Sequence, residues 1–267
     1  MRAACRRRLG LACLRVAGAF VSRFYASPEA VAGEEVAFDA QETRHLARVL
    51  RLRPGAVVRA IDGRGQQLTV RLTRIGARGA EGKVLDRTVH RSESPLDLTL
   101  VQAVPKGEKL ELIIRMTTEL GITRVVPIYS DRSVPRLEQE RESTRVARWQ
   151  RVAREAAKQS GRAVIPDILR PVPLSEWLTE PRPPGLILCL WEDSDRSAAT
   201  VLPEQHPDKA TLLVGPEGGF TDEEVEQAKA AGAIVAGLGP RILRTETAGP
   251  VGVALLQARY GDLGTAG

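Results

Sequence analysis

The sequence predicts an α/β protein in which a small β-rich domain precedes a larger domain built on a parallel sheet. Two apolar runs, each short enough to be a buried strand, end at Gly215-Pro216 and Gly239-Pro240. A capped helix is expected between them, which gives the order strand, loop, helix, strand, loop, helix. Between residues 57 and 73 apolar and polar side chains alternate instead, as is typical of a β-hairpin.

Residues 23–92 are expected to form the first domain. Val57–Ile61 leads into a turn sequence at Asp62–Gly65, after which apolar and polar residues alternate through Leu68–Leu72. Several short strands around one short helix, residues 42–51, predict a small barrel.

The first domain is locally basic. Residues 42–91 hold twelve Arg and Lys against four Asp and Glu, a balance of +8. On the expected helix Arg44, Arg48 and Arg51 recur at spacings of four and three, so we expect them on one face, where they could contact phosphates. The opposite face is expected to hold Leu46, Val49 and Leu50. An ordinary solvated helix face is the alternative interpretation of the three arginines.

Residues 97–263 are expected to form the second domain, after a linker that contains serines and a proline. Strands alternate with helices, which is typical of a parallel α/β sheet. The expected strands are 97–104, 122–129, 186–191 and the two apolar runs above, and the expected helices include 108–120 and 138–160. Because residues 92–267 sum to a charge of −4, the first domain is expected to bind most of a polyanionic partner.

Two further helices belong to the second domain. Thr221 and Glu224 form a capping box, and Gly232 stands where a left-handed cap would end that helix. The closing helix, about Thr247–Tyr260, is apolar around most of its circumference. Its apolar residues are Val251, Val253, Ala254, Leu255, Leu256 and Ala258. A second copy of the chain would cover the side that its own core leaves open, so we expect a homodimer; a helix buried wholly in its own chain is the alternative.

The two Gly-Pro loops mark the candidate ligand site. Ligands of open α/β sheets collect at the carboxyl ends of strands, so loops 215–220 and 239–245 are expected to converge. Glycines there let a ligand approach the backbone closely, although tight turns alone would also explain them. The residues expected to contact the ligand are Leu213, Gly215, Pro216, Glu217, Gly218, Gly219, Leu238, Gly239, Ile242, Leu243, Arg244 and Thr245.

Other site classes are excluded by the sequence. The run Gly237–Gly239 lacks the third glycine of a dinucleotide fingerprint, and neither a P-loop nor a Gly-x-Ser-x-Gly elbow occurs. The histidines lack ligand spacing and the three cysteines are widely spread, so no metal is expected. No apolar run approaches the roughly 20 residues that span a bilayer, so no membrane partner is expected.

A family resemblance is carried by the two loops. Gly215–Phe220 reads Gly-Pro-Glu-Gly-Gly-Phe, and Leu238–Ala248 reads Leu-Gly-Pro-Arg-Ile-Leu-Arg-Thr-Glu-Thr-Ala. These motifs resemble the signature of the bacterial RsmE-type ribosomal RNA uridine-N3 methyltransferases of the SPOUT superfamily. The resemblance extends through Lys106–Lys109, Thr118–Gly121 and Gln159–Arg162, and covers nearly everything after residue 22.

The resemblance implies a SPOUT-type trefoil-knotted parallel sheet domain preceded by a PUA-like RNA-binding β-barrel. Knots are close to forbidden in ordinary folds, and periodicity would not have suggested one. It also implies S-adenosylmethionine as the cofactor and ribosomal RNA of the small subunit as the partner.

The implied reaction assigns roles to single residues. Methylation at N3 of a uridine removes the imide proton while negative charge builds on the carbonyl oxygens. We expect Arg244 to be the cation near those oxygens and Glu246 to orient it or to assist deprotonation; the alternative for Glu246 is a first-turn acid that complements the dipole of the last helix. Arg23 and Arg162 are expected to contact RNA. Glu217 could instead hold its own loop by accepting backbone N–H bonds.

Residues 1–22 are expected to be a disordered leader or a transit-like extension. Residues 1–23 hold six arginines and no acid, which equals the net charge of +6 of the whole chain. Such a leader resembles a mitochondrial transit peptide, which would place the protein in the mitochondrial matrix. The alternative, which we favour, is a misplaced start codon with Val21 as the initiator in a GC-rich bacterium, and a cytoplasmic protein.

Three function classes stay open from the sequence. The first is the uridine-N3 methyltransferase, the second is a SPOUT enzyme that methylates another RNA position, and the third is an RNA-binding assembly factor without catalysis. Intact glycine loops favour the first two, because a protein without a cofactor needs no cradle for one.

Overall fold

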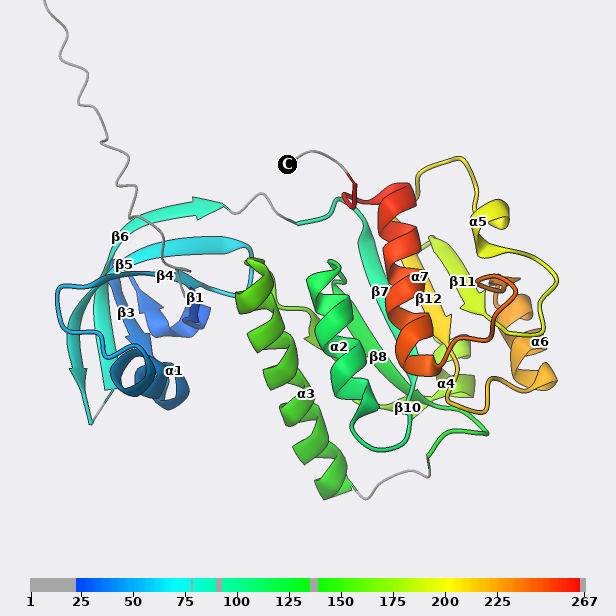
Figure 1. Ribbon diagram of the computed structural model, residues 1–267, viewed down its shortest axis with the longest axis horizontal. Coiled ribbons are helices and arrows are strands. Elements are labelled where there is room, and N and C mark those ends of the chain that lie inside the picture. Colours follow the sequence, from blue (N-terminus) through cyan, green and yellow to red (C-terminus); the bar gives the residue numbers. More distant parts are fainter. Residues whose placement is uncertain (1–22, 78, 90–92, 135–138, 265–267) are drawn as a thin grey trace, which may run out of the picture.

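The computed structural model describes residues 23–77, 79–89, 93–134 and 139–264. The expectations for residues 1–22 lie outside these ranges. Two separate sheets build the chain, a mixed one at the amino-terminal side and a parallel one at the carboxyl-terminal side (Figure 1). The α/β class predicted for the chain is therefore confirmed.

The first sheet is six-stranded, mixed and curled (Figure 1). Its strands are β1 (Arg23–Tyr25), β2 (Val31–Ala32), β3 (Glu35–Phe38), β4 (Val57–Ile61), β5 (Gln66–Gly76) and β6 (Gly79–Val89), in the order β1-β4-β5-β6-β3-β2, with a 3-10 turn η1 (Pro28–Ala30) after β1. The predicted hairpin is β4–β5, in which Ala60 pairs with Leu68 antiparallel. Phe24, Leu68 and Val70 belong to the core that the sheet encloses.

The predicted helix 42–51 begins and ends two residues earlier than expected, and its second half is differently wound. Helix α1 (Ala40–Arg44) begins at Asp39, whose carboxylate accepts the Glu42 N–H at 2.7 Å, and it continues as a π-helical turn η2 (His45–Val49). A π turn holds more residues than an α turn, so it rotates the following side chains out of the expected phase. The prediction that Val49 and Leu50 face inward is therefore wrong, since they are 68% and 37% exposed; Leu46 alone of the three is buried.

The second sheet is parallel throughout. Its strands are β7 (Asp97–Ala103), β8 (Arg124–Tyr129), β9 (Asp167–Ile168), β10 (Val172–Pro173), β11 (Leu186–Leu190), β12 (Lys209–Val214) and β13 (Ile234–Ala236), in the order β10-β8-β7-β12-β11-β13, with β9 also on β8. The five expected strands are all present. The two additional strands, β9 and β10, are only two residues long, which is too short for any periodicity to appear in the sequence.

Helices cover both faces of the parallel sheet (Figure 1). One face packs against α2 (Lys109–Glu119), α3 (Gln139–Ser160) and α7 (Thr245–Tyr260), and the other against α4 (Leu174–Thr179) and α6 (Asp222–Ala230); α5 (Ala198–Val201) lies beside β13. Successive strand residues point to opposite faces, so Leu212 joins the first core and Leu213 the second. The predicted capping box of Thr221 and Glu224 is present at α6.

The segment after β13 passes beside the loop that follows β11. Gly237 donates its N–H to the Arg196 carbonyl at 2.8 Å, and its own carbonyl accepts the Ala198 N–H at 2.9 Å. The Trp191 N–H is bonded to the Ala236 carbonyl. The two loops are thus fixed to each other; the knot that the resemblance implied stays a prediction.

Polar contacts join the two domains at two places. Between α1 and α3, Lys158 Nζ lies 2.6 Å from Glu42 Oε1. Between the β4–β5 turn and the chain after α3, the Ile165 N–H bonds to the Gly63 carbonyl at 3.0 Å and the Gly65 N–H to the Ala163 carbonyl at 3.1 Å. The domains are therefore held by both a helix pair and a backbone bridge.

Candidate active site

A cavity of about 500 Å³ lies where β11, β12 and β13 end. Loops that follow these three strands surround it, as expected for the carboxyl edge of a parallel sheet. It is lined by Lys109, Leu190, Trp191, Glu192, Ser194, Val214, Gly215, Pro216, Glu217, Gly219, Gly237, Leu238, Gly239, Pro240, Arg241, Ile242, Leu243, Arg244, Thr245 and Ala248. The predicted loops do converge, and most of the predicted contact residues are in this lining.

Two of the predicted contact residues, Leu213 and Gly218, do not line the cavity. Leu213 is fully buried in the core beneath α4 and α6, because the strand alternation turns it away from the face of its neighbour Leu212. Gly218 faces outward: a Cβ there would lie 3.3 Å from the Arg132 side chain, whose Nη1 donates to the Gly218 carbonyl at 2.8 Å. We therefore remove both from the candidate contact set.

Gly219 lines the cavity together with Gly215 of the same loop. Its φ is 69°, in the left-handed region, and a Cβ at this position would overlap the Glu192 carboxylate. The loop closes on itself through the Gly219 N–H, which bonds to the Pro216 carbonyl. A side chain at Gly219 would therefore displace Glu192, another residue of the cavity wall, as well as strain the backbone.

Thr245 and Gln102 tie the two glycine loops together. The buried Thr245 hydroxyl donates to the Gly215 carbonyl at 2.7 Å. Gln102 Nε2, also fully buried, lies 3.0 Å from Thr245 Oγ1 and 3.3 Å from the Gly215 carbonyl. The start of α7 is thus fixed against the loop after β12. The Thr245 hydroxyl donates its proton to the Gly215 carbonyl, so it has no proton to donate to a ligand.

A lysine between two carboxylates borders the cavity. Lys109 Nζ lies 3.0 Å from Glu217 Oε1 and 3.3 Å from Glu246 Oε2. The hydrogen bond to Glu217 is the main cause that raises the pKa of Lys109. Burial opposes it, but hydrogen bonds from Lys109 and backbone N–H groups hold the pKa of Glu217 below its ordinary value. Lys109 thus joins a carboxylate of the loop after β12 to one in the first turn of α7.

Glu217 meets both of its alternative expectations in part, whereas Glu246 meets only the structural one; its predicted role beside Arg244 stays a prediction. The Glu217 carboxylate accepts the Lys106 N–H at 3.1 Å, so it holds a neighbouring loop while it lines the cavity. Glu246 is in the first turn of α7, which starts two residues earlier than expected, and it also faces Lys109. Arg244 is exposed at the N-cap of α7, and within the described ranges its guanidinium has no ion-pair partner.

Four functional candidates were not identified from the sequence: Lys109, Gln102, Trp191 and Glu192. Lys109 belongs to the Lys106–Lys109 segment that carried part of the resemblance, which was a usable signal. Trp191 and Glu192 directly follow β11, so the rule that located the other two loops would have located them. Gln102 gave no signal, because it stands inside an apolar strand.

The structure places the expected RNA-contacting arginines in four different settings. Arg44 and Arg48 are exposed on α1 and η2. Arg51 is exposed but lies beyond the helix, with φ 50°, so the single-face stripe is wrong for it. Arg23 in β1 is half-buried, and burial, then the neighbouring Arg59, lower its pKa.

Arg162 is the clearest correction. Its side chain is 5% exposed; the guanidinium binds Glu93 at 2.7 Å and donates to the carbonyls of Thr118 and Ile122. The two carbonyls lie at and just after the end of α2, and Glu93 belongs to the linker. Arg162 therefore holds the linker against the end of α2, and its guanidinium is not available to RNA.

Comparisons with known proteins agree with this architecture. A family model described as an RNA methyltransferase domain matches residues 92–257, and one described as an RNA methyltransferase PUA domain matches residues 38–85. The chain belongs to the RsmE family of RNA methyltransferases. It is 33% identical to the ribosomal RNA small subunit methyltransferase E of Synechocystis over 88% of this chain and 77% of that protein. It is 31% identical to that of Bacillus subtilis over 78% of this chain and 84% of the relative.

Two solved structures of such proteins resemble the chain over nearly their full length. The ribosomal RNA small subunit methyltransferase E of Neisseria gonorrhoeae, bound to S-adenosylmethionine, has a TM-score of 0.82 and 34% identity, covering 91% of this chain and 99% of that one. A Legionella pneumophila methyltransferase in complex with the same cofactor has a TM-score of 0.84 and 30% identity, with the same coverage. The fold implied by the resemblance, a PUA-like domain followed by an RsmE-type SPOUT domain, is therefore confirmed.

Metal and membrane sites are not indicated in the part of the chain that the structure describes. No group of three or more His, Cys, Asp or Glu side chains there could hold a metal ion. None of the helices in these ranges has both the length and the apolar character of a membrane span.

Proposed function

We propose that this chain is an S-adenosylmethionine-dependent methyltransferase that methylates N3 of a uridine in small-subunit ribosomal RNA. The observation that carries the proposal is the cavity of about 500 Å³ formed by the two tied glycine loops, in a chain of the RsmE family. Two similar structures hold S-adenosylmethionine.

The residues of the cavity fit this cofactor. Its volume is within the roughly 300–1,000 Å³ typical of small-molecule pockets. The backbone of Gly215–Glu217, Gly219 and Leu238–Leu243 would hold the cofactor, since these residues line the cavity. When bound, S-adenosylmethionine supplies an electrophilic methyl group on a positively charged sulfur.

The charged residues at the start of α7 would act on the uridine. The Glu246 carboxylate accepts the proton from N3, and the Lys109 ammonium beside it keeps that carboxylate in place. The Arg244 guanidinium has no ion-pair partner among the described residues, so it is free to stabilise negative charge on a carbonyl oxygen of the uracil.

We also propose that the two domains have different functions. Residues 23–92 bind RNA through exposed arginines, including Arg44 and Arg48, and residues 97–263 hold the cofactor. We also propose that the chain is knotted where Gly237 lies between Arg196 and Ala198, since a crossing of loops at this position is what a knot requires. A cytoplasmic location is proposed as well, with the mitochondrial matrix as the alternative if residues 1–22 act as a transit peptide.

A homodimer through the last helix is a further part of the proposal. On α7, Val253 and Leu256 are buried in the chain's own core, whereas Val251 is 40% exposed. Leu112 on α2, which packs against α7, is also 40% exposed, so each of the two helices leaves an apolar side chain partly open to solvent. Light scattering of Val251→Glu against the wild-type protein tests this: a monomeric wild-type protein at micromolar concentration would refute the dimer.

The catalytic proposal is tested by incubating purified protein with labelled S-adenosylmethionine and unmodified small subunits, followed by mass spectrometry of the nucleosides. The expected product is N3-methyluridine, formed by the wild-type protein and lost in Glu246→Gln. A different methylated nucleoside would favour the second function class. Absence of any product, together with intact RNA binding, would favour the assembly factor.

A further inference from the structure

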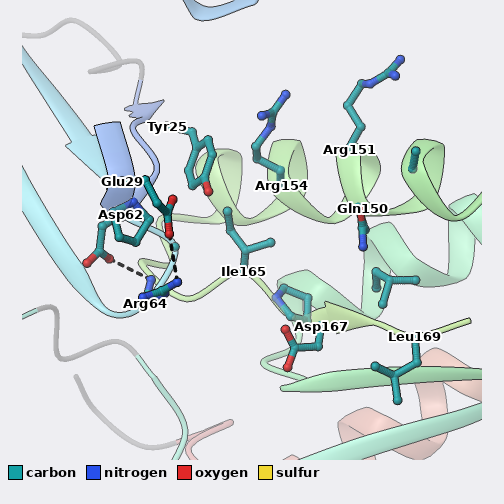
Figure 2. A pocket seen from close by; sticks show the side chains of 15 residues that line it. Tyr25, Glu29, Asp62, Arg64, Gln150, Arg151, Arg154, Ile165, Asp167 and Leu169 are labelled. Atoms are coloured by element: carbon teal, nitrogen blue, oxygen red, sulfur yellow. Dashed lines mark hydrogen bonds and ion pairs between the residues drawn. The ribbon is translucent and has the colours of Figure 1, made fainter. Parts of the chain in front are cut away.

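A second cavity, of about 570 Å³, lies between the two domains (Figure 2). From the first domain it is lined by β1, η1 and the β4–β5 turn, and from the second by the middle of α3 and residues 165–169. Asp167 and Ile168 form β9, which pairs with the beginning of β8. This cavity is therefore at the amino end of the parallel strands, whereas the cofactor cavity is at their carboxyl end.

Hydrogen bonds give this interdomain pocket a fixed wall. The backbone bridge between Gly63 and Ile165 crosses its floor. A Cβ on Gly63 would come within 3.1 Å of both Ile165 and Tyr25, so the three residues are closely packed. Asp62 Oδ1 accepts the N–H groups of Arg64 at 2.8 Å and Gln66 at 2.9 Å, which holds the turn in shape. The pocket is thus built from ordered backbone rather than from a chance gap between domains.

An aromatic and aliphatic surface faces this space. Figure 2 shows the Tyr25 ring and the Ile165 side chain near each other at the centre of the pocket. Both are half-buried, and Leu169 farther along is 42% exposed. The Arg154 guanidinium lies 5.2 Å from the centroid of the Tyr25 ring, which orients the ring. An unpaired base could stack on such a surface, because every base has an apolar face.

The carboxylates of the pocket already have partners. Glu29 pairs with Arg64 at 3.2 Å, Asp167 lies 3.9 Å from Arg124, and Asp62 is bonded to the turn. Glu29 and Asp167 are thus each opposed by an arginine, and the Asp62 carboxylate is occupied by backbone N–H groups of the turn.

Besides the buried Arg154 Nε, which has no hydrogen-bond partner, three further donor groups that line the pocket are unpaired within the described part of the chain. They are the Arg151 guanidinium and the Gln150 amide on α3, and the Tyr25 hydroxyl. Burial raises the pKa of Tyr25, with Arg154 opposing, so the phenol stays protonated and can donate. Proteins bind unpaired bases of RNA by stacking on aromatic rings and by hydrogen bonds to base edges, which Tyr25 and Gln150 could supply. Arg151 lies farther along α3 and points away from Tyr25 (Figure 2), so it could contact a phosphate outside the stacking surface.

We propose that the interdomain pocket binds one unpaired nucleotide of the RNA substrate, with the base against Tyr25 and Ile165 and a phosphate near Arg151. This inference rests on the proposed function for the identity of the RNA. Because the pocket is at the opposite end of the sheet from the cofactor cavity, this nucleotide is not the one that is methylated. Its binding fixes the path of the RNA between the basic first domain and the second domain.

Charge reversal on α3 tests the phosphate contact. Arg151→Glu should weaken binding of a fluorescein-labelled single-stranded RNA decamer roughly tenfold by fluorescence anisotropy. Arg141→Glu is the matched control, because Arg141 is an exposed arginine of the same helix outside the pocket and changes the net charge equally. Equal losses in the two variants would overturn the proposal, since they would report only the overall charge.

Substitution of the ring tests the stacking contact. Tyr25→Phe should retain most of the affinity, whereas Tyr25→Leu should lose roughly tenfold. Photocrosslinking of a 4-thiouridine-containing decamer should label peptides that contain Tyr25, Gln150 or Ile165. Crosslinks confined to the Arg44 and Arg48 surface would place the RNA elsewhere, even if Tyr25→Leu disturbed the fold.

Methyl transfer separates this proposal from the proposed function. Arg151→Glu should raise the KM for small subunits and leave S-adenosylmethionine affinity unchanged. An unchanged KM would refute the pocket while the methyltransferase stood. If wild-type protein transferred no methyl group but Arg151 and Tyr25 still governed RNA binding, the proposed function would fail and the pocket would stand.

Discussion

Lys158 of α3 and Glu42 of α1 form an ion pair between the domains from which water is almost excluded. The two side chains are 6% and 0% exposed, and Nζ lies 2.6 Å from Oε1. Lys158 Nζ also lies 3.1 Å from Glu155 of its own helix, so the lysine serves two carboxylates. A pair this deeply buried stabilises one domain arrangement only while both partners are present.

Removal of the lysine should destabilise the protein strongly. In Lys158→Met the Glu42 carboxylate would be left buried without its cation, a change that costs about 3–5 kcal/mol in free energy of unfolding. Urea denaturation measures this loss. The matched control is Lys229→Met, whose exposed pair with Glu226 should contribute at most about 1 kcal/mol. Similar losses in both variants would contradict a special role for the buried pair.

The Glu42 carboxyl should make stability depend on pH. Burial raises its pKa above the ordinary 4.5, although Lys158 opposes the shift. The folded state therefore binds this proton more tightly than the unfolded chain, so the stabilising contribution is present below pH 4.5 and is lost as the pH rises through the folded pKa. Glu42→Gln removes the titratable carboxyl at this position and serves as the reference. The stability of the wild type relative to Glu42→Gln should fall as the pH rises above 4.5, and a constant difference would refute the shift.

Gly219 and Gly218 should respond differently to an added methyl group. In Gly219→Ala the Cβ would displace the Glu192 carboxylate, which lines the cofactor cavity, so the affinity for S-adenosylmethionine measured by calorimetry should drop roughly tenfold, which is about 1.4 kcal/mol. Gly218→Ala meets only the movable Arg132 side chain and should bind as the wild type does. Gly232→Ala is the control for backbone strain, because its φ is 89° but no atom lies within 4 Å of the added Cβ. Loss of affinity in that control would mean that strain, and not the cradle, is being measured.

Lys109 should govern the acid limit of cofactor binding. The hydrogen bond from Lys109 helps to keep the pKa of Glu217 below its ordinary 4.5. The ionised Glu217 carboxylate therefore stabilises its loop fully above pH 4.5, and this stabilisation is lost as the pH falls through the lowered pKa. In Lys109→Met the pKa of Glu217 should rise, and affinity should begin to fall at a higher pH on acidification. Lys109→Arg retains the charge and should behave more like the wild type. Identical pH profiles for Lys109→Met and the wild type would show that Glu217 does not depend on Lys109.

Local signals predicted the elements of the second domain well. The Thr221–Glu224 capping box, the strand lengths and the alternation of strands with helices are all set by neighbours in sequence. The same reasoning failed at residues 45–51, because a π turn cannot be recognised from a pattern that assumes 3.6 residues per turn. The prediction therefore located a helix in the right part of the chain but assigned Val49 and Leu50 to the wrong face.

The sequence predicted the residues of the candidate site only where they follow the carboxyl end of a parallel strand. Loops at the carboxyl ends of strands converge in any parallel sheet, so Gly215 and Leu238 were found. Arg162 was misassigned because its acceptor Glu93 comes from a linker 69 residues earlier, a contact that only the tertiary structure reveals. Lys109 was missed for a related reason: its role depends on carboxylates from two other segments of the chain.

The bonds between Gly237 and the loop after β11 make two walls of the cofactor cavity depend on each other. Leu238–Ala248 supply one wall, and Gly237, directly before them, is bonded to the backbone of Arg196 and Ala198. Trp191, Glu192 and Ser194, from the start of that same loop, line the cavity as well. A substitution that displaces the loop after β11 should therefore alter the cavity from two sides at once, even where the substituted residue does not itself line it.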